Sequence, residues 1–298
     1  MRWLAALLLA LLVVAPAVAA RASVAVTDDT GHRVVLSAPA QRIVSLAPHL
    51  TEILYAIGAG DRVVATVSHS DYPSAAQHLP RVGTYNHLNV EAILAQQPDL
   101  VVGWKSGNPD DQLARLRRLG ISVYVNEPRE LGDIARTMRT LGILTGTQSK
   151  ATAAALGFRH RLQGLRQRYA GRSRVNVFYE VWNDPLMTVN GDHVISDVIR
   201  GCGGHNVFAA LPSIAPQVTV ESVLARDPDA IVASGMGNGR PQWLDAWKRW
   251  PDLAAVEHDN LFYLPPDTLQ RLSPRILQGM AGMCRALQRA RTHDQEAP

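Results

Sequence analysis

An internal repeat constrains the fold of this chain more than any other sequence feature. Residues 89–102 (NVEAILAQQPDLVV) align without gaps on residues 219–232 (TVESVLARDPDAIV), at an offset of 130 positions. A repeat at this spacing in a chain of 298 residues predicts two similar halves, each large enough to hold a core. The pattern therefore favours two lobes over one undivided globule.

Each copy of the repeat reads as a short helix that leads into a buried strand. Asn89 and Thr219 are suited to cap the helix, and a glutamate follows in its first turn, where an acid favours the helix dipole. A Pro-Asp pair then ends the helix before an apolar run. Further strands are expected at 42–46, 121–125, 174–180 and 261–264, and further helices at 49–57 and 193–200.

Alternation of short apolar strands with helices predicts an α/β fold in which each lobe has a mainly parallel sheet flanked by helices. Between the lobes, residues 147–169 contain no proline and carry apolar residues at helical spacing. A helix of about 22 residues is about 33 Å long. We expect residues 147–171 to form a backbone helix between an N-terminal lobe at 21–146 and a C-terminal lobe at 172–298. A helix that belongs to one lobe alone is the alternative.

The first twenty residues have the pattern of a secretory signal peptide. A charged start, an apolar run at 3–14 and small residues at 15–20 follow one another. The apolar run is shorter than the roughly 20 residues that span a bilayer. We expect export to the periplasm, with cleavage after Ala19 or Ala20, and a soluble mature protein.

Export also determines how the two cysteines are interpreted. Cys202 and Cys284 are the only cysteines in the chain. In an oxidising compartment an even pair of thiols favours a disulfide, although two separate buried thiols remain the alternative.

Composition and motifs narrow the function classes. The formal net charge is +4, and the basic residues are spread along the chain, so we expect no nucleic-acid partner. The chain has no Gly-x-Ser-x-Gly elbow, no His-Glu-x-x-His helix and no phosphate-binding Gly-Lys-Ser/Thr loop. We therefore expect no enzyme, with an exported hydrolase of scattered catalytic residues as a remote alternative.

A set of short motifs, in a fixed order, resembles the periplasmic cobalamin-binding proteins of ABC importers, a branch of the helical-backbone metal-receptor group. The resemblance covers residues 42–287. Besides the two repeats, it rests on RIVSLAPHLTE at 42–52, SDYP at 70–73, CGGHNVF at 202–208 and SPR at 273–275.

The resemblance implies a class III periplasmic binding protein, in which a cleft between the lobes captures cobalamin or a related corrinoid. It implies a monomer with no intrinsic cofactor and no metal site of its own. Glu91 and Glu221 match the paired surface acids that dock onto a two-fold symmetric ABC permease and its ATPase. Equivalent acids on equivalent lobes suit such a partner, although both can also serve only the helix dipole.

The resemblance also assigns residues to the ligand site. The N-terminal lobe contributes His69, Tyr85 and Trp104, and the C-terminal lobe contributes Met187, Asp267 and Arg271. A corrinoid is a flat ring with amide groups, so aromatic walls and a few polar groups suit it. The spacing of Asp267 and Arg271 also permits a simple surface ion pair.

Several of these positions differ from the pattern of the family. His69 replaces a tyrosine, Tyr85 a tryptophan, Met187 a phenylalanine, and Ala215 stands where a tryptophan is typical. Because His49, His69 and His87 all fall in or beside loops expected to face the cleft, a haem or ferric-chelate receptor of the same fold is the alternative function. The sequence does not decide whether His69 or His87 coordinates a metal.

Overall fold

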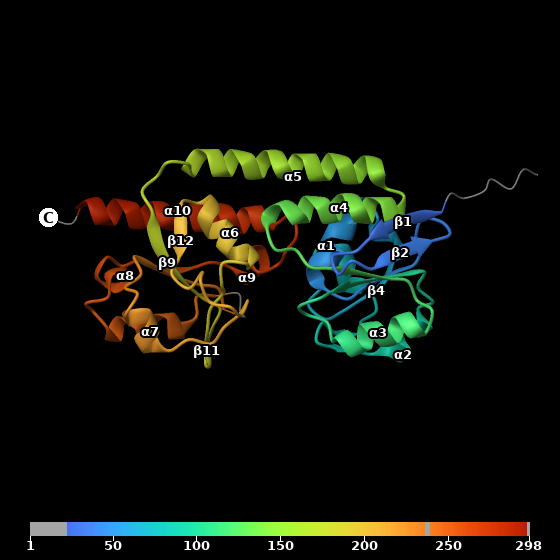
Figure 1. The fold of residues 1–298 in the computed structure, drawn as a ribbon, viewed down its shortest axis with the longest axis horizontal. Coiled ribbons are helices and arrows are strands. Elements are labelled where there is room, and N and C mark those ends of the chain that lie inside the picture. The colour runs from blue at the N-terminus through green and yellow to red at the C-terminus, as the bar shows by residue number, and fades with distance from the viewer. Residues whose placement is uncertain (1–22, 236–238, 297–298) are drawn as a thin grey trace, which may run out of the picture.

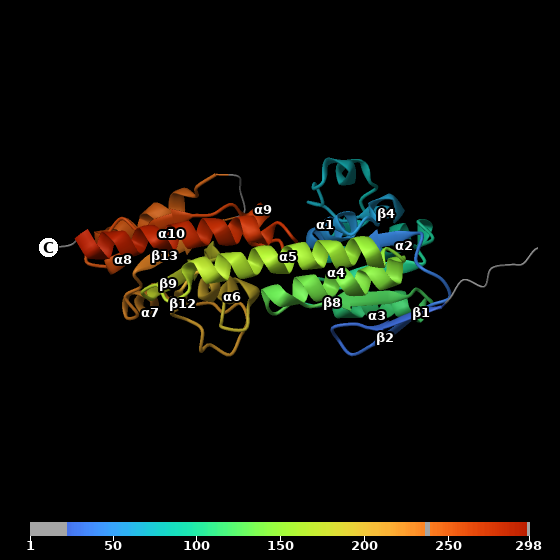
Figure 2. The ribbon, with the colours of Figure 1, turned by 90° about the horizontal axis from the view of Figure 1, so that it is seen from above.

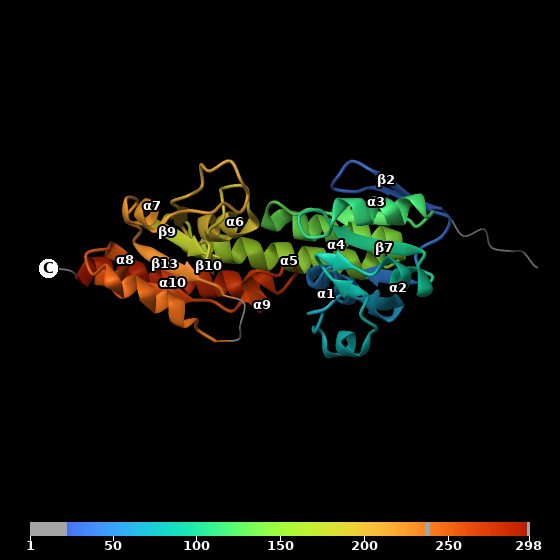
Figure 3. The same cartoon turned by 90° about the horizontal axis from the view of Figure 1, so that it is seen from below.

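The computed structural model of this chain describes residues 23–235 and 239–296. The expected signal peptide and residues 236–238 of the loop after the second repeat lie outside the described residues. Two groups of strands lie side by side beneath a layer of long helices (Figure 1). Figure 2 shows this helical layer from above, and Figure 3 shows the opposite face.

Each half of the chain forms one four-stranded parallel sheet. The strand order is β4-β3-β7-β8 in the N-terminal lobe and β12-β9-β13-β14 in the C-terminal lobe. Numbered by chain order within each sheet, both orders are 2-1-3-4, which confirms the duplication. The strands are β3 (Ile43–Ser45), β4 (Val63–Thr66), β7 (Leu100–Trp104), β8 (Val123–Asn126), β9 (Val175–Glu180), β12 (Gly204–Asn206), β13 (Ala230–Ala233) and β14 (Leu261–Tyr263).

The repeat found in the sequence has the same local structure in both copies. The side chains of Asn89 and Thr219 each accept a hydrogen bond from the backbone N–H three residues later, as caps do. The carboxylate of Asp99 accepts the backbone N–H of Arg42 at 3.0 Å, and Asp229 accepts that of Asn176 at 2.6 Å. Each aspartate thus ties its repeat to the start of a central strand, β3 or β9. The repeat helices are α2 (Val90–Ala95) and α7 (Val220–Leu224).

A long helix joins the two lobes. It buries only a narrow stripe that includes Ala151, Phe158 and Leu162, and it exposes most of its other side chains. It packs along the last helix of the N-terminal lobe and also reaches two helices of the C-terminal lobe. The predicted backbone helix is therefore confirmed. These helices are α5 (Gln148–Tyr169), α4 (Leu131–Thr145), α6 (Val194–Gly201) and α10 (Ile276–Glu296).

One apolar core runs through both lobes beneath the helical layer. It includes Leu50 and Leu100 of the N-terminal lobe, Phe158 of α5, and Val177 and Met280 of the C-terminal lobe. Two further cores cover the other face of each sheet, one under α2 and α3 (Asp110–Arg118) and one under α7 and α8 (Ala254–Glu257). Because close-packed interiors resist deformation, the shared core limits relative motion of the lobes.

The remaining elements are short. Helix α1 covers the first sheet beside α4, and α9 follows the last strand of the second sheet. Within residues 23–235 and 239–296, three two-stranded hairpins and three 3-10 helices complete the fold. These elements are α1 (Pro48–Ala56), α9 (Pro266–Leu269), β1 (Val24–Thr27), β2 (Arg33–Leu36), β5 (Gly83–Thr84), β6 (His87–Leu88), β10 (Trp182–Asn183), β11 (Leu186–Met187), η1 (Gly60–Arg62), η2 (Ser74–His78) and η3 (Gln242–Arg249).

A disulfide closes the C-terminal lobe. Cys202 at the end of α6 is bonded to Cys284 in α10, and both residues are fully buried. The bond was expected from the even number of thiols and the predicted export, and it is confirmed.

Candidate ligand-binding site

Loops from the carboxyl ends of the two sheets meet where the lobes join. Asp71 lies in the loop after β4, and Arg271 follows β14 and α9. The guanidinium of Arg271 donates to both carboxylate oxygens of Asp71, with Nη2 3.2 Å from Oδ2. Since ligands of parallel α/β sheets bind at the carboxyl ends of the strands, this meeting point is the candidate site.

The N-terminal lobe contributes an aromatic pair. Trp104 ends β7 and is half-buried, and Tyr85 lies in the turn between β5 and β6 with 41% of its surface exposed. Their ring centroids are 6.0 Å apart at an interplanar angle of 46°. The structure thus brings together two of the predicted ligand residues.

A buried asparagine holds this pair in place. Asn108 donates from Nδ2 to the carbonyl oxygens of Tyr85 and Leu46, at 2.7 and 2.9 Å, and its Oδ1 accepts the backbone N–H of Trp104 at 2.7 Å. Three segments are tied together by one amide. The sequence shows Asn108 only as part of a Gly/Asn-containing loop, so its role was not predicted.

The three candidate histidines have different environments. His49 lies in α1, not in a loop, and is buried beneath Trp104 with its Nε2 3.2 Å from Oδ1 of Asn126. Burial lowers the pKa of His49 to about 4, so its ring is neutral near pH 7. His69 and His87 are exposed, and His69 has a left-handed backbone (φ +64°), a conformation that is uncommon outside glycine although histidine adopts it more often than most residues. An unusual backbone of this kind is often found at functional loops.

The C-terminal lobe contributes polar groups and a hairpin. Asp267 in α9 forms an ion pair with Arg271 at 2.8 Å. Met187 is half-buried in β11, and Trp182 in β10 is also half-buried, its indole N–H donating to the carbonyl of Asp184 at 2.7 Å. The ion pair that the spacing of Asp267 and Arg271 permits, as the alternative to a ligand role, is present. It is more than a surface pair, because Arg271 also reaches the other lobe.

A buried carboxylate crosses the lobe junction beside this point. Glu52 of α1 accepts Ser273 Oγ at 2.5 Å and Arg275 Nε and Nη2 at 2.9 and 2.8 Å. Only 2% of the Glu52 side chain is exposed. The guanidinium of Arg275 also stacks on the ring of Tyr72, 4.0 Å from its centroid. We call Glu52, Ser273 and Arg275 the interlobe clamp.

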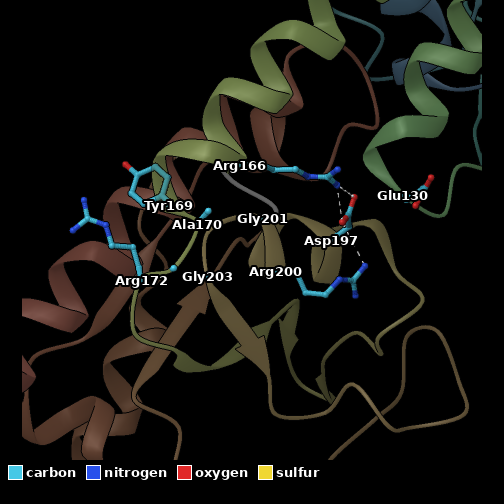
Figure 4. Close-up of a pocket in the computed structure, with 10 residues that line it drawn as sticks. Glu130, Arg166, Tyr169, Ala170, Arg172, Asp197, Arg200, Gly201 and Gly203 are labelled. Atoms are coloured by element: carbon cyan, nitrogen blue, oxygen red, sulfur yellow. Dashed lines mark hydrogen bonds and ion pairs between the residues drawn. The ribbon is translucent and has the colours of Figure 1, made fainter.

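A separate groove lies away from these residues. This groove of about 580 Å³ is bordered by α4, α5 and α6 (Figure 4). There Arg166 and Arg200 turn toward Asp197, which accepts Arg166 at 2.8 Å and the backbone N–H of Leu131 at 2.9 Å. None of the six predicted ligand residues lines this groove, and its charged groups join α6 to the start of α4.

The two helices that carry the repeat glutamates lie on one outer face. Helices α2 and α7 occupy the side of the molecule opposite α5, one in each lobe (Figures 1 and 3). Glu91 and Glu221 are both exposed. Glu91 pairs with Arg115 at 2.9 Å, whereas hydrogen bonds from its own backbone and from Thr219 lower the pKa of Glu221.

Metal-ligand clusters and membrane-spanning helices are both absent from the described residues. Within 23–235 and 239–296, no three His, Cys, Asp or Glu side chains are grouped so as to hold a metal ion. No helix in this part of the chain combines the length and the apolar composition that a membrane span requires.

Comparison with known proteins places these features in context. A family model described as periplasmic binding protein matches residues 43–268. A vitamin B12-binding protein of Vibrio cholerae is 39% identical over 249 residues, which is 83% of this chain and 88% of that protein. The vitamin B12-binding protein of Yersinia pestis is 36% identical over 260 residues, 85% of this chain and 89% of the relative.

Solved structures agree with this placement. The crystal structure of the periplasmic vitamin B12 binding protein BtuF of Vibrio cholerae superposes with a TM-score of 0.78 at 38% identity, over 85% of this chain and 98% of that one. A periplasmic heme binding protein from Pseudomonas aeruginosa gives a TM-score of 0.74 at 25% identity, over 83% of this chain and 92% of the other. The relatives are named as binding proteins, not as enzymes.

Proposed function

Because the chain belongs to the periplasmic binding protein family, we propose that it captures cobalamin in the periplasm and delivers it to an ABC permease. The observation that carries the proposal is the likeness of both lobes together to a vitamin B12-binding protein, at 38% identity over 85% of the chain. Likeness at this level, over a shared strand order and backbone helix, supports a shared ligand class as well as a shared fold.

The candidate site offers the chemistry that a corrinoid needs. Trp104 and Tyr85 supply aromatic surface for the flat ring, and Met187 adds a polarisable apolar side chain from the other lobe. Asp267 and Arg271 supply an acceptor and donors for the peripheral amides of the corrin. His69 lies two residues before Asp71, in the loop that contacts Arg271, and so adds an imidazole at the rim.

Delivery assigns a role to the two repeat glutamates. A permease built from two equal subunits presents the same basic site twice, and Glu91 and Glu221 are equivalent exposed acids on equivalent lobes. Each can make the same charge-assisted contact with an arginine of one subunit. The leader at 1–20 directs export, with cleavage after Ala19 or Ala20.

Titration of the purified mature protein with cyanocobalamin and, in parallel, with haemin tests the ligand. The account expects saturable binding of one cyanocobalamin per chain, weakened about 10-fold or more by Trp104→Ala or Arg271→Ala. Arg159→Ala, an exposed change on α5, is the matched control and leaves affinity unchanged. Tight haemin binding without cyanocobalamin binding would contradict the proposal.

One observation justifies the parallel titration with haemin. His69 is exposed at the lobe junction, and imidazole is a common axial ligand of haem iron. Against it, His49 is buried and neutral, and the identity to the haem-binding protein is lower than to the vitamin B12-binding proteins.

Charge reversal tests docking separately from ligand capture. In vesicles that contain the cognate permease and its ATPase, Glu91→Arg together with Glu221→Arg is expected to stop cobalamin uptake and to leave cobalamin affinity unchanged. Asp61→Arg with Glu257→Arg makes the same double reversal at exposed sites outside α2 and α7, and is expected to preserve uptake. Normal uptake by the first variant would exclude the docking role.

A further inference from the structure

Both terminal nitrogens of Arg271, proposed above as a ligand residue, are already engaged with acids. Its Nη1 donates to Glu52 at 3.2 Å and to Asp71, and its Nη2 donates to Asp71 at 3.2 Å and pairs with Asp267 at 2.8 Å. A guanidinium carries two hydrogens on each Nη. A ligand oxygen can therefore reach Nη1 or Nη2 only if one of these carboxylates gives way.

The three acids are held with unequal firmness. Glu52 has 2% of its side chain exposed and belongs to the interlobe clamp, so it is fixed by Ser273 and Arg275 as well. Asp71 has 50% of its side chain exposed, and among the described residues the side-chain donors to its carboxylate belong to Arg271. Arg271 holds the pKa of Asp71 below its ordinary value, so the pair is charged near neutral pH.

Asp71 and Asp267 also differ in what they join. Asp267 lies four residues before Arg271 in the same lobe, so their pair does not depend on how the lobes are placed. Asp71 belongs to the N-terminal lobe, and its pair with Arg271 spans the carboxyl ends of the two sheets. Among these three acids, Asp71 is therefore both the most exposed and the one whose release would open the junction.

We propose that Asp71 is a latch residue: its bidentate pair with Arg271 closes the mouth of the site across the two lobes, and a corrin amide displaces it on binding. The inference rests on the proposed function for the identity of the ligand. The amide oxygen takes the donors that Asp71 gives up, while Asp267 remains to accept the amide N–H. The Glu52 clamp persists in both states and keeps the lobes together.

In this latch, Asp71 and the ligand compete for the same donors of Arg271, and this competition affects the measured affinity and association rate. The apparent affinity is the intrinsic affinity multiplied by the fraction of molecules with the latch open. Half-exposed ion pairs are weak and are screened by salt, so Asp71→Asn is expected to accelerate cyanocobalamin association about 3- to 10-fold. Cyanocobalamin has no net charge, so electrostatic steering adds little to the salt dependence. Raising the ionic strength should accelerate the association of cyanocobalamin with the wild-type protein and should not change its association with Asp71→Asn.

The experiment combines stopped-flow association of cyanocobalamin at low and high ionic strength with a ligand-free distance measurement. Asp245→Asn is the matched control, because Asp245 is similarly exposed and pairs with Arg240 and Lys248 inside one lobe. It should retain the wild-type rate and salt dependence. Asp71→Ala repeats the test without the residual hydrogen bond of an amide. An unchanged or slower rate in both Asp71 variants would overturn the latch.

Spin labels at Ala95→Cys and Ala225→Cys, exposed and equivalent positions at the C-terminal ends of α2 and α7, report the separation of the lobes. Without ligand, Asp71→Asn is expected to broaden this distance distribution, and Asp245→Asn is not. If the wild type fails to bind cyanocobalamin, the proposed function fails, and the distance measurement still decides the latch. If the wild type binds but neither readout responds to Asp71→Asn, the latch alone fails.

Discussion

Glu52 offers the sharpest test of how the lobes are held together. The substitution Glu52→Gln keeps the shape of the side chain and removes its charge. The carboxylate accepts four hydrogen bonds, one from Ser273, two from Arg275 and one from Arg271. Because the NH2 group of a glutamine cannot accept, the substitution removes the two bonds to one oxygen whichever way the amide is turned. At about 1.5 kcal/mol for each charge-assisted bond, the loss in unfolding free energy is about 3 kcal/mol. Burial of Glu52 at 2% exposure removes the screening that makes surface pairs weak.

Urea unfolding, followed by circular dichroism, measures this loss. Glu127→Gln is the matched control, because Glu127 bonds to Ser106 and pairs with Arg129 within the N-terminal lobe. A double-mutant cycle between Glu52→Gln and Arg275→Gln should give a coupling energy of about 1.5–2 kcal/mol. A loss below about 1 kcal/mol together with zero coupling would refute the clamp as a stabilising contact.

Three further predictions concern stability. Replacing Cys202 and Cys284 together by alanine opens a loop of 82 residues and should cost about 4.5 kcal/mol in urea unfolding on the chain-entropy estimate; a loss under 1 kcal/mol would contradict it. Burial lowers the pKa of the His193 imidazole in the folded protein to about 4. As pH falls from 6.5 toward 4, this imidazole is protonated in the unfolded chain and stays neutral in the folded one, so the free energy of unfolding declines over that range. The neutral His193 ring caps α6 as a hydrogen-bond acceptor, and an asparagine can make the same cap without taking up a proton. His193→Asn should therefore raise the free energy of unfolding by on the order of 1 kcal/mol at pH 5 and leave it unchanged at pH 8, as measured by thermal unfolding at a series of pH values. Burial raises the pKa of the Glu180 carboxyl from 4.5 to about 7, so the free energy of unfolding falls as pH rises through that interval. Glu180→Gln should flatten this decline and gain about 2–3 kcal/mol of unfolding free energy relative to the wild type at pH 8. If the pH dependence of stability has the same slope in the variant, Glu180 is already ionised at lower pH.

Local patterns in the sequence predicted the architecture well, because local rules govern them. Asn89 and Thr219 cap helices in the structure as their residue types indicate, and Pro-Asp follows each helix in both copies. A repeat in sequence must repeat its contacts if both halves fold by the same rules, and the two sheets share one strand order. The backbone helix was recognised from its lack of proline and from its apolar stripe, both of which are also local features.

The candidate site was less predictable, because its contacts join residues far apart in sequence. Glu52 and Arg275 were visible only as parts of two motifs, and nothing local indicates that they meet across 223 positions. The signal available was a single acid in a largely apolar helix, since a buried charge requires a partner. Arg271 was expected to serve a ligand, yet its pairing with Asp71 depends on how the lobes are placed.

His49 is a residue whose environment could not be predicted from the sequence. Its position beside a loop suggested that it faces the ligand, whereas α1 begins at Pro48 and directs it into the core against Asn126. Whether a histidine at the start of a helix points inward depends on packing between the sheet and that helix. Neither composition nor spacing reports this.

The most direct test of the central claim is the crystal structure of the mature protein with cyanocobalamin. The account predicts the corrin ring between the lobes, against Trp104 and Tyr85 on one side, with its amides on Asp267 and Arg271 and with Asp71 displaced from Arg271. A corrin bound in the groove between α4, α5 and α6, or on the face of α2 and α7, would contradict it.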